Sequence, residues 1–141
     1  IHLQTFNEDD YAYYDEKLEK KWIDIREIRK AVTSALEIKR NEKLIGSSLQ
    51  AQVVIFLESE ILNNVKNIDL SELSIVSDFK IKEMDEKNSS ALSFDDPRVF
   101  VDVEIAPGLK CQRCWTVKEE VRNNSLQMCD RCDNVWKSVS K

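Results

Sequence analysis

Glycine, histidine and long apolar runs are scarce in this sequence, and each scarcity excludes a class of protein. Only two glycines occur among the 141 residues, Gly46 and Gly108, so neither a phosphate-binding Walker loop nor a GxGxxG dinucleotide turn is present. The single histidine, His2, leaves no Ser-His-Asp or Cys-His arrangement for nucleophilic catalysis. No apolar run approaches the roughly 20 residues of a membrane span. The chain is therefore predicted to lack an active site of its own and to have no membrane contact.

Charge is distributed unevenly along the chain, whose formal net charge is -5. Residues 108–141 carry seven basic and four acidic side chains, whereas the preceding residues carry an excess of acids. Such a split favours contact between the basic end and a polyanion. A strongly charged surface together with paired, reduced cysteines is typical of the cytoplasm. The first residue, Ile1, is not methionine, which predicts that the sequence is an excerpt from a longer polypeptide.

All four cysteines lie in two matching C-x-R-C pairs, Cys111 with Cys114 and Cys129 with Cys132. The spacing is typical of a four-thiolate zinc site, in which each pair forms a knuckle that presents two sulfurs. A disulfide framework, a redox C-x-x-C motif and an iron site with the same ligands are the alternatives. The duplicated pair favours Zn²⁺, because a redox motif needs only one pair and usually a βαβ setting. Four sulfurs leave no coordination position for water, so the metal is predicted to be structural.

A long amphipathic helix is predicted from residue 15 to a stop at Gly46. Its apolar residues recur at steps of three and four, and its acids lie at the start and its bases at the end, as the helix dipole favours. We expect this apolar stripe to pack on a core. Its members are Leu18, Trp22, Ile25, Val32 and Leu36. Residues 1–14 form an opening segment with aromatic anchors, which are Phe6, Tyr11, Tyr13 and Tyr14.

The segment after Gly46 changes to a two-residue period. Strands are predicted at 51–57, 74–81 and 99–105, with a short helix at 58–65 and a mobile polar loop at 83–96. Pro107 and Gly108 end the last strand. The predicted fold class is α+β, consisting of a long amphipathic helix, a small α/β layer and a C-terminal four-cysteine zinc finger.

Two motifs resemble one known family. The stretch Arg40–Leu49 (RNEKLIGSSL) is similar to a signature near the carboxyl end of bacterial isoleucyl-tRNA synthetases, and Lys110–Trp115 with the second cysteine pair looks like that family's terminal zinc finger. The resemblance implies three parts. They are the end of a helical anticodon-binding domain at 1–45, a small α/β junction domain at 46–107, and a zinc-finger tRNA-binding module at 108–141.

In that family this region grips the anticodon stem and loop of tRNA(Ile), while upstream domains of the same polypeptide use ATP to activate isoleucine. The resemblance thus implies an isoleucine-tRNA ligase whose fragment here lacks the active site, and we expect a monomer. The family shares its finger with DNA glycosylases of the formamidopyrimidine type, so a lesion-binding module for duplex DNA is an alternative. A zinc-ribbon module for protein interaction is a third possibility.

Five side chains near the knuckles are predicted to contact tRNA. Arg113 and Trp115 match the family's loop-reading positions, but Arg113 and Arg131 are also placed to offset the charge of about minus two that four thiolates leave around one zinc ion, and Trp115 has the alternative of packing under the finger. Lys118, Arg122 and Lys137 are assigned to phosphate contacts. Trp136 is predicted to pack the final helical turn against the finger.

Overall fold

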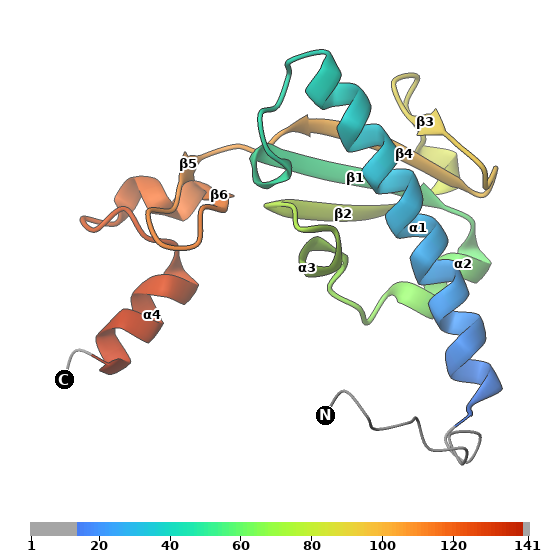
Figure 1. Ribbon diagram of the computed structural model, residues 1–141, viewed down its shortest axis with the longest axis horizontal. Coiled ribbons are helices and arrows are strands. Elements are labelled where there is room, and N and C mark those ends of the chain that lie inside the picture. Colours follow the sequence, from blue (N-terminus) through green and yellow to red (C-terminus); the bar gives the residue numbers. More distant parts are fainter. Residues whose placement is uncertain (1–13, 140–141) are drawn as a thin grey trace, which may run out of the picture.

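The computed structural model describes residues 14–139, in which a long helix lies across one face of a four-stranded sheet and a small finger follows (Figure 1). This arrangement confirms the predicted α+β class. The helices and strands that precede the finger are α1 (Glu16–Asn41), β1 (Ala51–Leu57), α2 (Ser59–Val65), α3 (Leu70–Ser74), β2 (Asp78–Glu83), β3 (Leu92–Ser93) and β4 (Val99–Ile105). The predictions made for His2, Phe6, Tyr11 and Tyr13 lie outside the described residues.

The sheet has the strand order β2-β1-β4-β3, with β1 parallel to β2 and antiparallel to β4. Every residue of β1 is buried, because this strand lies in the middle of the sheet and is covered on both faces. That position explains why its sequence is an unbroken apolar run rather than an alternating one. Both β1 and β4 have the predicted bounds, and the predicted helix at 58–65 is confirmed as α2.

Helix α1 begins at an N-cap, Asp15, whose carboxylate accepts the backbone N–H groups of Lys17 and Leu18 at 2.9 and 3.1 Å. Such a cap satisfies donors that have no partner inside the helix. The helix ends at Asn41, and Lys43 takes the left-handed backbone conformation with φ 60°. The predicted stop at Gly46 was therefore wrong, because a lysine ends the helix first.

The apolar stripe of α1 packs on the sheet only from Ile25 onward. Leu18 is 51% exposed and Trp22 is 43% exposed, because the first turns extend beyond the edge of the sheet (Figure 1). The prediction that the whole stripe packs on a core was therefore wrong for these two residues. Periodicity identifies the apolar face of a helix, but it does not show how far the partner surface reaches.

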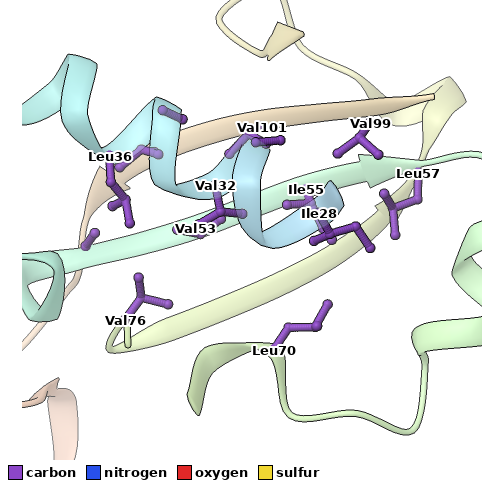
Figure 2. Close-up of a cluster of buried hydrophobic side chains, with 14 of the residues drawn as sticks. Ile28, Val32, Leu36, Val53, Ile55, Leu57, Leu70, Val76, Val99 and Val101 are labelled. Atoms are coloured by element: carbon purple, nitrogen blue, oxygen red, sulfur yellow. The ribbon is translucent and has the colours of Figure 1, made fainter. Parts of the chain in front are cut away.

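One hydrophobic core joins α1 to the sheet (Figure 2). Side chains from α1, β1 and β4 meet between the helix and the sheet, and Leu70 and Val76 close one end. Each fully buried aliphatic side chain of this kind contributes roughly 1.5–3 kcal/mol relative to exposure. The second half of α1 thus shares its core with β1, and the domain boundary predicted at residue 45 stays a prediction.

Strand β2 begins at Asp78, so the strand predicted from residue 74 was placed too early. The preceding residues belong to the short helix α3, which Asp69 caps by accepting the N–H groups of Ser71 and Glu72 at 2.9 and 3.1 Å. Ile75 then ends α3 in the left-handed conformation with φ 56°. The local cap therefore prevails over the alternating pattern.

The polar segment between β2 and β4 packs against the sheet face opposite α1. Asn88 and Ser90 donate hydrogen bonds of 2.6 and 2.7 Å to the buried carboxylate of Asp102, and the Lys87 ammonium lies 3.7 Å from the ring centroid of Phe100. The segment also contains strand β3, which pairs with β4. The sequence prediction of a loop without a strand was wrong at β3.

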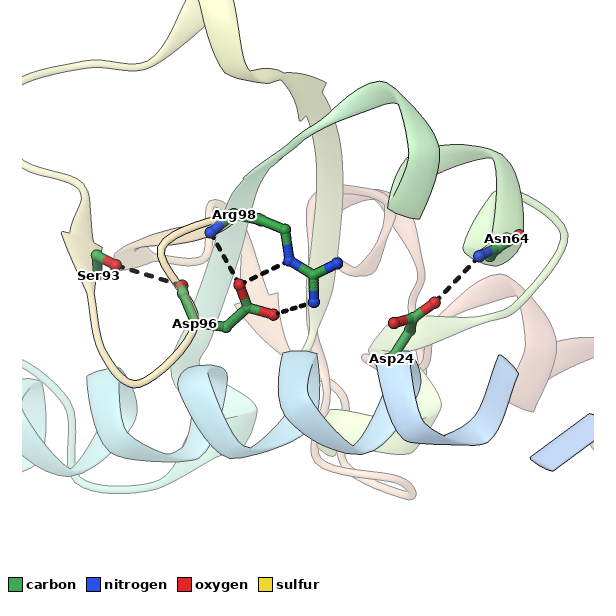
Figure 3. A network of polar contacts seen from close by, with 5 residues as sticks. All are labelled: Asp24, Asn64, Ser93, Asp96 and Arg98. Atoms are coloured by element: carbon green, nitrogen blue, oxygen red, sulfur yellow. Dashed lines mark hydrogen bonds and ion pairs between the residues drawn. The ribbon is translucent and has the colours of Figure 1, made fainter. Parts of the chain in front are cut away.

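The turn before β4 is held by Asp96 and Arg98 (Figure 3). Arg98 donates to the Asp96 carboxylate from its backbone N–H, Nε and a terminal guanidinium nitrogen, at 2.9, 3.0 and 2.7 Å. The hydrogen bond from the Arg98 side chain holds the pKa of Asp96 below its usual value of 3.8. Nearby, Asn64 of α2 donates to Asp24 of α1 at 3.0 Å, which joins the two helices.

Candidate metal centre

A separate finger follows the sheet. Its elements are β5 (Leu109–Lys110), β6 (Val117–Lys118), the 3-10 turn η4 (Glu119–Asn123) and α4 (Asp130–Val139). Strands β5 and β6 form a two-stranded antiparallel hairpin. Gly108 connects it to the sheet with φ 118°, and a Cβ atom there would lie 2.3 Å from the backbone carbonyl carbon of Lys118. Only glycine fits both that conformation and that contact.

The first knuckle is the connection between β5 and β6. The Cys111 N–H donates to the Thr116 carbonyl at 2.8 Å, and the Trp115 N–H donates back to the Cys111 carbonyl at 3.0 Å. Trp115 has φ 69°, a left-handed conformation that is unusual for a bulky residue and that needs support from its surroundings. The backbone of Trp115 is thus held in a tight turn beside Cys114.

The second knuckle leads into α4, which begins directly after Cys129. Gln127 takes a left-handed conformation with φ 51° and joins the two knuckles. Its carbonyl accepts the Gln112 N–H at 3.0 Å, and its side-chain oxygen accepts the Gln112 amide at 3.2 Å. The finger therefore holds its two halves together by backbone as well as by sulfur.

The four sulfur atoms all lie within 4.8 Å of one another, with Cys114 and Cys129 3.7 Å apart. Four sulfurs at 2.3 Å from a tetrahedral zinc ion would lie about 3.8 Å apart, so the cluster is positioned to hold a metal ion of that size. The cysteines are not joined in disulfides, which argues against the disulfide alternative. Three of the four are buried, and Val121 and Met128 pack around them.

The thiols differ in how readily they lose a proton. Burial raises the pKa of Cys129 to about 12. Burial acts in the same direction on Cys111, but the backbone N–H groups of Cys114, Cys129 and Arg113 outweigh it and lower the pKa of Cys111 to about 6. Backbone donors therefore already stabilise a thiolate at one ligand position, and a bound cation would favour the thiolate form at all four.

The structure places Arg113 and Trp115 at the surface of the first knuckle. Trp115 is 59% exposed, so it does not pack under the finger. The Lys110 ammonium lies 4.8 Å from the centroid of its ring, a contact that sequence reasoning missed although Lys110 directly precedes the first cysteine. Arg113 is exposed, and the group that it brings to the sulfur of Cys111 is its backbone N–H.

The three predicted phosphate contacts lie on different elements of the finger. Lys118 is half-buried in β6, whereas Arg122 in η4 and Lys137 in α4 are exposed. Lys137 donates to Asp133 at 2.5 Å. Arg131 lines a groove together with Cys114 and Cys129.

Trp136 is 53% exposed, so the prediction that it belongs to the core was wrong. Cys132 is the buried residue of α4, and the helix then runs away from the rest of the finger (Figure 1). The later turns of α4 therefore have no surface of the finger to cover. Within residues 14–139, no helix has the length and apolar character that crossing a membrane requires.

Comparison with known proteins gives two findings. Residues 108–135 match a family model described as a zinc finger found in FPG and IleRS. The isoleucine--tRNA ligase of Natranaerobius thermophilus is 33% identical over 148 residues, which cover 100% of this chain. The chain is similar to isoleucine--tRNA ligases over its whole length. Those of Bradyrhizobium diazoefficiens and Listeria monocytogenes are 42% and 36% identical, over 86% and 96% of the chain.

The resemblance to isoleucine--tRNA ligases predicted from the two sequence motifs is thus confirmed. These relatives are enzymes, and the chain matches their C-terminal region. It spans 16%, 12% and 15% of the lengths of the three relatives named above.

Proposed function

We propose that this chain is the tRNA-binding C-terminal part of an isoleucine-tRNA ligase, and that it grips the anticodon stem and loop of tRNA(Ile). ATP is used only by the catalytic domain upstream, which performs the aminoacylation. The observation that carries the proposal is an exposed tryptophan on a cysteine knuckle, in a chain similar to these ligases throughout its length. In this proposal residues 1–45, 46–107 and 108–141 are the anticodon-binding, junction and finger parts.

One structural Zn²⁺ is held by Cys111, Cys114, Cys129 and Cys132. The distances between the sulfurs support this assignment, as does the zinc-finger family model that covers all four. A closed shell of four thiolates offers no position for water or substrate. The metal therefore fixes the shape of the two knuckles and takes no part in chemistry.

Trp115 and Arg113 read the anticodon loop. Unpaired bases of a loop can stack on aromatic or guanidinium planes and be recognised on their edges. The left-handed backbone at Trp115 and its hydrogen bond to Cys111 support this role, because a ring held in place before binding loses little freedom on binding. Lys118, Arg122 and Lys137 contact phosphates, since flexible cations follow a backbone without reading its sequence.

The upstream domains of the same polypeptide are partners in this proposal, and the protein works as a cytoplasmic monomer. A DNA-binding finger of the glycosylase type is the runner-up, because the family model describes both kinds of protein. The similarity of the other residues to isoleucine--tRNA ligases favours tRNA. A module for protein interaction would need neither the exposed indole of Trp115 nor the exposed side chain of Arg113.

Binding of the zinc-loaded chain to three labelled nucleic acids tests the proposal. They are tRNA(Ile), the same tRNA with its anticodon bases replaced, and a DNA duplex that contains an oxidised purine. We expect tRNA(Ile) to bind at least about tenfold more tightly than either competitor, since one lost stacking or base contact is worth about 1–3 kcal/mol. Equal binding of the two tRNAs would refute anticodon reading, and preference for the duplex would favour the runner-up.

A further inference from the structure

A single buried hydroxyl connects the finger to the sheet. Ser77, which directly precedes β2, is 2% exposed. Its Oγ accepts the backbone N–H of Val117 at 2.6 Å and donates to the Leu49 carbonyl at 2.5 Å. Its own N–H donates to the Ala51 carbonyl at 3.1 Å. Ser77 is therefore fixed to the start of β1 on one side and holds strand β6 of the finger on the other.

No second polar contact shares this task among the residues that the structure describes. Between residues 14–107 and 108–139 the Ser77–Val117 hydrogen bond is the only one, and no ion pair crosses. The other attachment is the covalent connection before Gly108, where the Ala106 N–H donates to the Gln50 carbonyl at 2.8 Å. A connection at one point leaves rotation free, and the hydrogen bond at Ser77 supplies the second point.

Packing on either side of this hydrogen bond is interrupted by grooves. One groove, of about 360 Å³, is lined by Ile75 and Ser77 from the sheet side and by Thr116 from the finger. A second, of about 290 Å³, is lined by Asp78 and Val117 among others. Because side chains do not fill the space beside the contact, close packing contributes little to holding the finger at one angle.

We propose that Ser77 is a positioning residue that fixes the orientation of the finger and thereby of its RNA-reading knuckle. Val117 follows Trp115 by two residues and pairs with Lys110 across the hairpin. Holding Val117 therefore holds both members of the Lys110–Trp115 pair relative to α1 and the sheet. This inference rests on the proposed function, because a fixed orientation aids binding by removing in advance the freedom that RNA would otherwise have to restrict.

The orientation is tested without RNA, by residual dipolar couplings of the zinc-loaded chain. One alignment tensor should fit the sheet and the finger of the unmodified protein. In Ser77→Ala the couplings of the finger should shrink and require their own tensor, while the zinc content stays at one per chain. Ser90→Ala is the matched control, since it removes a hydroxyl that bonds to Asp102 at 2.7 Å, away from the finger. A single unchanged tensor in Ser77→Ala would overturn the proposal.

A second variant protects the test against misfolding. If Ser77→Ala does not fold, Ser77→Cys keeps a side chain of similar shape but replaces the hydroxyl by a poor hydrogen-bonding group. We expect the same separation of tensors in this variant. One common tensor for Ser77→Cys would equally overturn the positioning role.

The RNA arm shows whether the orientation serves binding. Ser77→Ala should raise the dissociation constant for tRNA(Ile) about three- to tenfold, and it should have no further effect in a Trp115→Ala background, because Ser77 acts through the knuckle. A full additional loss in that background would refute this route. If the unmodified chain bound no tRNA, the proposed function would fail, but the tensors would still decide whether Ser77 orients the finger.

Discussion

The ammonium of Lys110 lies 4.8 Å from the centroid of the Trp115 indole, at the two ends of the first knuckle. A cation over an aromatic ring is attracted by the negative face of that ring. The contact covers one face of a side chain that is otherwise exposed and leaves the other available for a base. Lys110 also adds positive charge where a loop phosphate would approach.

Trp115→Ala should raise the dissociation constant for tRNA(Ile) about ten- to hundredfold, since stacking on an unpaired base is worth about 1–3 kcal/mol. Zinc content and thermal unfolding should stay nearly unchanged, because the exposed ring supports no core. Trp136→Ala, which removes another exposed indole on α4, is the control and should bind as the unmodified chain does. Equal losses in both variants would indicate that any exposed tryptophan contributes, without a reading role for Trp115.

Replacing Lys118, Arg122 or Lys137 by alanine should weaken binding to every tRNA by a similar factor. Each loss of one phosphate contact should lower the slope of log K against log salt by about one. Binding titrations at several salt concentrations measure both effects, with Lys20→Ala on the exposed side of α1 as the control. A change of anticodon preference in any of these variants would assign that residue to base reading.

The elements that the sequence predicts well are those whose signals are local. Strands β1 and β4 are apolar runs between residues that break them, and the cysteine spacing alone indicates the metal cluster. The first turns of α1 were predicted less well, because the pattern at Leu18 and Trp22 is the same whether or not a sheet lies beneath it. Trp136 was placed in the core for the same reason.

Contacts between distant segments could not be predicted from the sequence. Ser77 is a serine at a strand start like many others, and its role depends on Val117 coming within 2.6 Å through the fold. The left-handed conformation of Trp115 gives no signal either, because such a position usually favours glycine. In the finger, the metal and the backbone turns impose this conformation on a residue that does not prefer it.

Removal of the metal should unfold the finger and spare the sheet. The finger's own core consists mainly of its cysteines with Val121 and Met128, so metal binding must supply on the order of ten kcal/mol of its folding free energy. Cys132→Ser, or a strong chelator, should collapse the amide signals after Gly108 while those of β1 persist. Loss of both sets of signals would show that the finger and the sheet fold as one unit.

The last prediction concerns pH and the turn before β4. Asp96 accepts three hydrogen bonds from Arg98, and its pKa in the folded protein lies below 3.8. A carboxyl group whose pKa is lowered by folding stabilises the protein above its unfolded pKa, and this contribution is lost as the pH falls through the folded value. Asp96→Ala should therefore cost about 1–2 kcal/mol at pH 7, since Arg98 is partly exposed and solvent screens the pair.

The difference between Asp96→Ala and the unmodified chain should shrink as the pH falls below 4. Urea unfolding followed at the amide of Val101 in β4 measures it without interference from the finger, which loses its metal in acid. Asp96→Asn is the matched variant, because it keeps an oxygen that can accept the Arg98 N–H but has no charge to titrate. Its cost should be smaller at pH 7. A difference for Asp96→Ala that stayed constant from pH 7 to pH 3 would show that hydrogen-bond geometry, and not the charge of Asp96, holds the turn.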